Sequence, residues 1–139
     1  MTETVAAIVA AHRAGQLSPA QTVARSFQRI RDHNDPAIFI SLRDEADAVA
    51  EAEALIARDA ARLPLYGIPV AVKDNIDVAG LPTTAACPAY AYMPSLDATS
   101  VARLRAAGAI MIGKTNLDQF ATGLVGVRSP YGVPHNPLD

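Results

Sequence analysis

Gly67-Ile68-Pro69-Val70-Ala71-Val72 is an uninterrupted apolar run, and it decides the fold of this 139-residue chain. A strand covered on both faces has such a composition, whereas a strand with one wet face alternates polar and apolar residues. The proline at position 69 fits best at the start of a strand or on an edge. The run therefore predicts a strand over residues 67–72 with both faces covered.

The sequence after this run completes a strand–helix–strand unit. Asp97 is suited to cap a helix over residues 98–107, which Gly108 ends, and residues 109–112 form a second buried strand. Strands joined by a crossover helix run parallel, so Lys73 and the residues after position 113 should meet at one edge of the sheet. Sites in α/β folds form at that edge.

The first 62 residues read as helices around one short strand. Apolar spacing predicts a helix from residue 5 to Gly15, and Ser18-Pro19-Ala20-Gln21 has the pattern of a capping box that begins a second helix. Residues 38–40 are β-prone, and the Ala- and Glu-rich residues 44–62 predict a third helix. Near the other end, residues 129–137 hold too many Pro and Gly residues for a regular element.

Composition excludes several classes of protein. Half of the residues are apolar, the net charge is −2, and no basic block suggests binding to nucleic acid or to a membrane surface. No apolar run approaches the roughly 20 residues that cross a bilayer. The single cysteine and the absence of a basic, apolar leader at Met1-Thr2-Glu3-Thr4 predict a cytoplasmic protein.

One motif imitates a phosphate-binding loop. Residues 108–115 match G-x-x-x-x-G-K-[ST] at every position. A phosphate loop follows a strand and curls around the phosphate, whereas the four intervening residues here are themselves a predicted strand preceded by a helix. The context therefore argues against nucleotide binding.

Cysteine and histidine give no catalytic or metal site. Cys87 would need a base to act as a nucleophile, and His12, His33 and His135 lie in unrelated contexts without a clear orienting partner. The histidines also lack the i, i+4 spacing of metal ligands. We expect Cys87 to pack as a small side chain, and no metal.

Lys73 and Asp74, directly after the first buried strand, have two readings. Lys73 can extend its charge into water for structural reasons alone, or it can lie partly desolvated at the sheet edge, where a neutral amine accepts a proton. Asp74 either orients the loop or caps a turn. The residues alone leave both alternatives open.

Three ordered blocks resemble the amidase-signature family: residues 64–75 around Lys73, residues 113–123, and residues 129–137. The resemblance implies an α/β fold in which a mixed β-sheet is sandwiched between helices. It also implies that residues 1–139 are the N-terminal part of one such domain, with a helical segment over 1–62 and the lysine-bearing βαβ region over 64–139.

Two further stretches, residues 83–88 and 123–132, look like the allophanate hydrolase branch of the family, in which Arg128 replaces an Asn of many relatives. Family enzymes use a Ser–cis-Ser–Lys triad, and the resemblance gives Lys73 the role of base. No serine here matches the Gly/Ser-rich motif that carries both serines, so we expect them beyond Asp139. Relatives line the acyl pocket with residues that correspond to Ala121, Thr122 and Gly123, and Arg128 is a candidate substrate contact.

The leading hypothesis is therefore an amide hydrolase fragment that, when complete, cleaves allophanate to ammonia and carbon dioxide without a cofactor or metal. The alternatives are the amidase subunit of a tRNA-dependent amidotransferase, a general amidase, or a non-catalytic module that lacks the Gly/Ser motif. The expected partner is a small amide or urea-derived molecule, with no nucleic acid and no membrane. Homo-oligomerisation of the full-length protein is left open.

Overall fold

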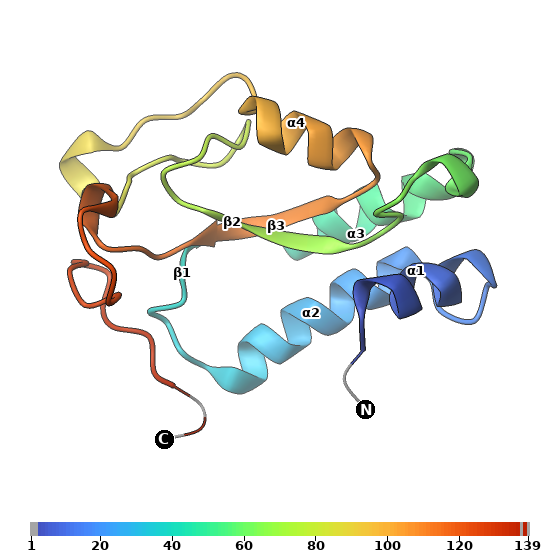
Figure 1. The fold of residues 1–139 in the computed structure, drawn as a ribbon, viewed down its shortest axis with the longest axis horizontal. Helices are drawn as coiled ribbons and strands as arrows, with labels where there is room; N and C mark the ends of the chain where they lie inside the picture. Colours follow the sequence, from blue (N-terminus) through green and yellow to red (C-terminus); the bar gives the residue numbers. More distant parts are fainter. Residues whose placement is uncertain (1–2, 137, 139) are drawn as a thin grey trace. The chain divides into compact units, whose positions relative to one another are not determined.

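The computed structural model describes residues 3–136 and 138, and within them four helices and three strands follow one another along the chain (Figure 1). The predicted α/β class is confirmed. The helices are α1 (Val5–Arg13), α2 (Pro19–His33), α3 (Glu45–Ala54) and α4 (Thr99–Ala106); the strands are β1 (Phe39–Leu42), β2 (Pro69–Lys73) and β3 (Ile110–Thr115).

The strands form one mixed sheet in the order β1-β3-β2. β1 pairs with β3 in the antiparallel sense. β2 and β3 run in the same direction, because the N–H of Ile110 donates to the carbonyl of Ile68 (2.9 Å) and, further along both strands, the N–H of Asp74 donates to the carbonyl of Thr115 (3.0 Å). The predicted parallel strand–helix–strand unit is present, and Lys73 ends its strand at the same edge as Thr115.

A glycine allows β1 to approach β3. Gly113 is the partner of Leu42 in the register of the two strands. A Cβ at position 113 would lie 2.7 Å from the carbonyl oxygen of Ser41 and 3.0 Å from the Leu42 side chain, well inside normal contact. Any side chain there would push the strands apart.

The two parallel strands differ in how deeply they are buried. Ile110, Met111 and Ile112 of β3 are buried, as predicted for residues 109–112. The strand continues further than predicted, and Gly113 and Lys114, expected to emerge at its end, are buried as well. β2 differs from the prediction, since Val72 is buried whereas Ala71 and Lys73 are exposed. The strand order explains the difference: among the described residues β2 is an edge strand, which also suits the proline at its start.

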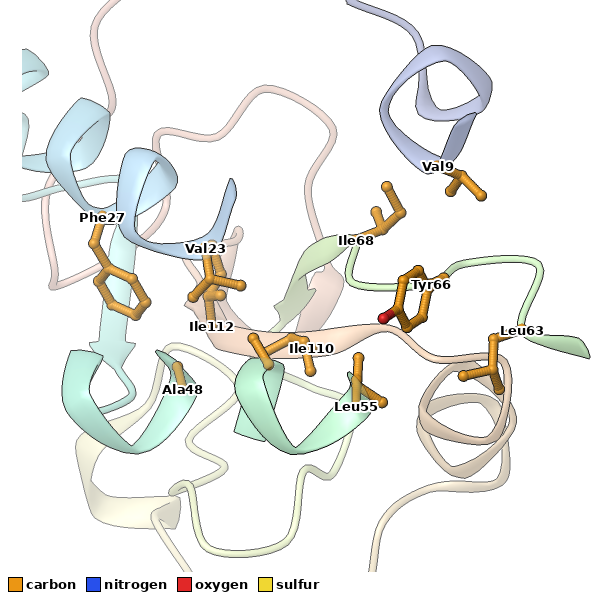
Figure 2. Close-up of a cluster of buried hydrophobic side chains, with 11 residues drawn as sticks. Val9, Val23, Phe27, Ala48, Leu55, Leu63, Tyr66, Ile68, Ile110 and Ile112 are labelled. Carbon is orange, nitrogen blue, oxygen red and sulfur yellow. The ribbon is translucent and has the colours of Figure 1, made fainter. Parts of the chain in front are cut away.

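The chain divides into two compact units, and the first contains a cluster of buried hydrophobic side chains. It comprises Met1–Asp32, Arg43–Val70 and Ala102–Ile112. Figure 2 shows its side chains converging from α1, α2, α3, β3 and the segment before β2. The buried members are Val9, Val23, Phe27, Ala48, Ala52, Leu55, Leu63, Tyr66, Ile68, Ile110 and Ile112.

Local sequence signals set the start of α2. The Ser18 N–H donates to Gln21 Oε1 (2.9 Å) and the Gln21 N–H donates to Ser18 Oγ (3.0 Å), which is the predicted capping box. Gly15 has the left-handed φ of +68° expected where the preceding helix ends. These signals place α2 so that its buried residues face the core.

The third helix is shorter than predicted. α3 ends at Ala54, and two separate 3₁₀ turns cover Leu55–Ala57 and Ala60–Arg62. Between them Arg58 is extended, and Asp59 accepts a hydrogen bond from the Ala61 N–H (3.0 Å). An aspartate that caps a new turn competes with continuation of the helix, and composition alone did not reveal this.

The second unit holds the candidate site. It comprises His33–Leu42, Ala71–Val101 and Gly113–Asp139, and outside the strands and the start of α4 it is mostly loop and short turns. Residues 129–136 contain no regular helix or strand, as predicted, whereas Pro137 of that stretch, like Met1, Thr2 and Asp139, lies outside the described residues. Polar contacts hold these loops together.

Candidate active site

Lys73 is the last residue of β2, and its side chain is exposed. No carboxylate among the described residues forms an ion pair with it. The exposed position agrees with the structural reading of the sequence, in which the amine reaches water, and the partial desolvation that suits a base is not seen within these residues.

Asp74 is buried, with no exposed surface. Its Oδ2 accepts a hydrogen bond from the Thr84 N–H (3.0 Å) and another from the Thr84 hydroxyl. Its backbone N–H donates to Thr115, and its carbonyl accepts from the Ala85 N–H (3.2 Å). Of the two readings of Asp74, the structure supports the one in which it orients the loop.

Lys114 is the partner that sequence reasoning missed. Its ammonium lies 3.1 Å from Asp74 Oδ1, and it donates hydrogen bonds to the Pro82 carbonyl (3.0 Å) and to Thr83 Oγ1 (3.1 Å). Both charged side chains are 0% exposed. A charge within a buried strand needs such partners, so the available signal was the lysine in an otherwise apolar strand.

The same contacts explain why the phosphate-loop match is false. Residues 110–115 are strand β3, and the buried Lys114 ammonium donates hydrogen bonds to Pro82 and Thr83 and forms an ion pair with Asp74. No phosphate can be held by an ammonium that is enclosed in this way. The intervening residues of the motif thus form a strand, which is the context that argues against a phosphate loop.

Two pairs of non-glycine residues adopt left-handed backbone conformations. Ala85 and Ala86 have φ of +50° and +58°, and Phe120 and Ala121 have +53° and +57°. The two turns are joined, since the Phe120 N–H donates to the Ala85 carbonyl (2.9 Å) and Gln119 Nε2 donates to the Ala86 carbonyl (3.0 Å). Such conformations cost free energy and concentrate at functional sites.

Asp118 organises the loop that follows the second turn. Its Oδ2 accepts from the N–H groups of Val125 and Gly126 (both 3.0 Å), and its Oδ1 accepts from that of Arg128 (2.8 Å). These backbone hydrogen bonds hold the pKa of Asp118 below its ordinary value, and the one from Gly126 has the largest effect. Gly123 fits closely, because a Cβ there would lie 2.4 Å from Asp118 Oδ2.

The four predicted substrate contacts lie in this region. Ala121 and Thr122 are exposed, and Thr122 Oγ1 donates to the Gln119 carbonyl (2.8 Å). Arg128 is held through its backbone, since its carbonyl accepts from the Gln119 N–H (2.8 Å). Its guanidinium is exposed and forms no ion pair within the described residues. These residues and Lys73 all belong to the second compact unit.

Cys87 and His12 lie in different surroundings. Cys87 is a free, half-buried thiol. His12 is buried between the Tyr66 carbonyl and the Thr22 hydroxyl, both 2.7 Å from ring nitrogens. In the described part of the chain no cluster of His, Cys, Asp or Glu has the arrangement of a metal site, and no helix there is long and apolar enough to span a bilayer.

Comparison with known proteins decides the family. The family model named Amidase matches residues 21–139, most of the chain. The chain belongs to the amidase family. Urea amidolyase of Lachancea kluyveri is 64% identical over 99 residues, which cover 70% of this chain and 5% of that protein.

Other amidase-family members share less identity over more of the chain. A glutamyl-tRNA(Gln) amidotransferase subunit from Symbiobacterium thermophilum is 44% identical over 132 residues, covering 91% of this chain and 27% of that protein. The solved structure of Kluyveromyces lactis allophanate hydrolase superposes with a TM-score of 0.79 at 45% identity, covering 95% of this chain and 22% of that chain. The chain thus spans about a quarter or less of these family members.

Proposed function

We propose that this chain is the lysine-bearing part of an amide hydrolase that acts on allophanate. The observation that carries the proposal is the 64% identity to a urea amidolyase, together with the structural likeness to an allophanate hydrolase. The resemblance of residues 83–88 and 123–132 to the same branch agrees with it. Since the chain spans only part of these relatives, the activity belongs to the longer polypeptide.

In the proposed mechanism Lys73 is the general base. The bridging serine passes the proton of the second serine to Lys73, and the oxygen of the second serine attacks the amide carbonyl. The C–N bond then breaks, ammonia leaves with that proton, and water hydrolyses the resulting acyl-enzyme. No carboxylate among the described residues pairs with Lys73, so none stabilises its protonated form. The amine is also accessible, which suits the role of base. Its water shell has to be displaced by substrate or by other parts of the polypeptide before the neutral amine is favoured.

Arg128 is proposed as the contact for the allophanate carboxylate. A guanidinium binds a carboxylate through two parallel hydrogen bonds, which fixes both position and orientation. The fixed backbone and exposed side chain of Arg128 leave its donors available for this contact. Ala121, Thr122 and Gly123 are proposed to line the acyl pocket beside it.

The amidase subunit of a tRNA-dependent amidotransferase is the second candidate. It is favoured by the 44% identity that extends over 91% of the chain. A cytoplasmic location, action without a cofactor, and a single amidase-signature domain over residues 1–139 remain predictions under either candidate. A homo-oligomeric state of the longer protein also stays open.

The experiment is an ammonia-release assay on the full polypeptide, with allophanate and glutamine as competing substrates. Lys73→Ala should lower turnover of allophanate by about three or more powers of ten, because removing the base disables the nucleophile. Circular dichroism should show that the variant remains folded. Preference for glutamine would favour the amidotransferase candidate, and near wild-type turnover by Lys73→Ala would remove Lys73 from the mechanism.

A further inference from the structure

Asp74 is anchored through its backbone and its side chain together. The backbone bonds to Thr115 and Ala85 fix its main chain at the sheet edge. The carboxylate bonds to Thr84 and pairs with Lys114. Two segments, β3 and the loop residues 84–85, therefore determine where the residue after Lys73 lies.

Stability alone explains this arrangement poorly. Removing two charges from water costs several kcal/mol per ion, and well-packed apolar residues in place of a buried ion pair are often equally stable or more so. The two hydrogen bonds from Thr84 to Oδ2, together with the ion pair at Oδ1, do fix the direction of the Asp74 carboxylate. Lys114 has three oxygen neighbours for its three protons, so it is itself unavailable to a substrate.

We propose that Asp74, Lys114 and Thr84 form a positioning unit that sets the direction in which Lys73 presents its amine. The proposal rests on the proposed function, in which Lys73 is the base. The Lys73 side chain has no ion-pair partner among the described residues that would fix its direction. Its direction therefore depends on the backbone, which is anchored at the neighbouring Asp74. All three are positioning residues, since they act on the reaction through Lys73.

Thr84 connects this unit to the proposed acyl pocket. Its Oγ1 accepts from the Ala86 N–H (3.1 Å) and so holds the left-handed turn at Ala85 and Ala86. That turn binds Phe120 through the Ala85 carbonyl. One hydroxyl therefore fixes both the segment that bears the base and the segment that precedes residues 121–123.

The test compares Thr84→Val with Thr84→Ser in the full-length enzyme. Valine has nearly the shape of threonine but can neither donate to Asp74 nor accept from Ala86. We expect Thr84→Val to lower kcat by about 10- to 100-fold, because small misplacements of a catalytic group are costly, and to change KM by less than about 2-fold. Thr84→Ser keeps the hydroxyl and should retain most of the turnover.

The matched control is Thr22→Val. Thr22 is also a buried threonine with a side-chain hydrogen bond, to His12, and it belongs to the other compact unit. The control should melt at a lower temperature than wild type and keep its kcat. If Thr84→Val and Thr22→Val lower kcat equally, or if serine does not restore turnover, the role of Thr84 is structural and the proposal is wrong.

Asp74→Asn combined with Lys114→Met provides a second variant in case Thr84→Val fails to fold, since it leaves neither charge buried without its partner. It removes the ion pair but keeps the shape of the Asp74 side chain, and we expect the same loss of kcat at similar KM. Wild-type kcat in this double variant would overturn the positioning role even when Lys73→Ala is inactive. Full turnover in Lys73→Ala would instead overturn the proposed function, so the two failures are distinguishable.

Discussion

The Nζ atom of Lys114 lies 3.1 Å from Oδ1 of Asp74, and neither side chain has any exposed surface. The two residues are 40 positions apart in sequence and meet because β2 and β3 run parallel and end at the same edge. A full charge in this environment is tolerated only with its counter-charge beside it. Without Lys114 the Asp74 carboxylate would be buried without a counter-charge, and without Asp74 the same would hold for the Lys114 ammonium.

Removing one partner should destabilise the protein more than removing both charges. Lys114→Met leaves the Asp74 carboxylate buried without a counter-ion, and we expect it to lower the free energy of unfolding by about 3–5 kcal/mol. The double variant Asp74→Asn/Lys114→Met should lose less than the sum of the two single variants. Urea unfolding of the four proteins checks this, and additive losses would show that the two side chains do not interact.

Arg128 should determine affinity for the carboxylate of the substrate. Lysine keeps the charge but not the paired donors, so Arg128→Lys should raise the KM for allophanate about tenfold, equivalent to about 1.4 kcal/mol. Arg103, another exposed arginine, serves as control, and Arg103→Lys should leave KM unchanged. An unchanged KM in Arg128→Lys would rule out the contact.

Loss of the Asp118 charge should release the loop over residues 123–128. Hydrogen bonds from the loop lower the pKa of Asp118 below its ordinary 3.8, so the stabilisation is present above pH 3.8 and is lost as pH falls through the lower pKa of the folded state. Hydrogen exchange of the Val125, Gly126 and Arg128 amides should therefore accelerate only below pH 3.8.

The control for this prediction is the amide of Phe120, whose partner is the Ala85 carbonyl rather than a carboxylate. After correction for the intrinsic pH dependence of exchange, the Phe120 amide should stay protected to a lower pH than the loop amides. Asp118→Asn should remove the loop protection already at neutral pH. Equal protection of all these amides in wild type and variant would mean that Asp118 does not hold the loop.

Local signals predicted much of the fold. The capping box at Ser18 and Gln21 and the left-handed Gly15 depend on neighbouring residues, so their residue types were sufficient. The apolar run in β3 likewise predicted a buried strand. The exposure of Ala71 in β2 was not predictable in this way, because an apolar run does not state whether a strand is central or at an edge.

The candidate site was harder to predict because its contacts are non-local. Sequence reasoning singled out Lys73 and asked whether Asp74 orients a loop, but the answer lies in Thr84 and Lys114, which fold back from later segments. The strand–helix–strand pattern predicts that Lys114 lies near Lys73 at one sheet edge, but it does not reveal that Lys114 is buried and paired with Asp74. The left-handed turns at Ala85 and Phe120 were also missed, since alanine and phenylalanine give no signal for such a backbone.

The last prediction concerns residues 1–139 expressed alone. They should show no amidase activity, because among the described residues no serine hydroxyl is bonded to Lys73, and a base without a nucleophile cannot form an acyl-enzyme. They should also associate, because within the described part of the chain β2 is an edge strand, and large apolar side chains such as Ile56, Met93, Leu96 and Leu124 are more than half exposed. Ammonia release from allophanate and size-exclusion chromatography measure the two outcomes, with Lys73→Ala as the activity control. Turnover that depends on Lys73 would reveal a nucleophile within these residues, whereas a monodisperse monomer that melts cooperatively would show that the exposed edge and apolar side chains do not drive association.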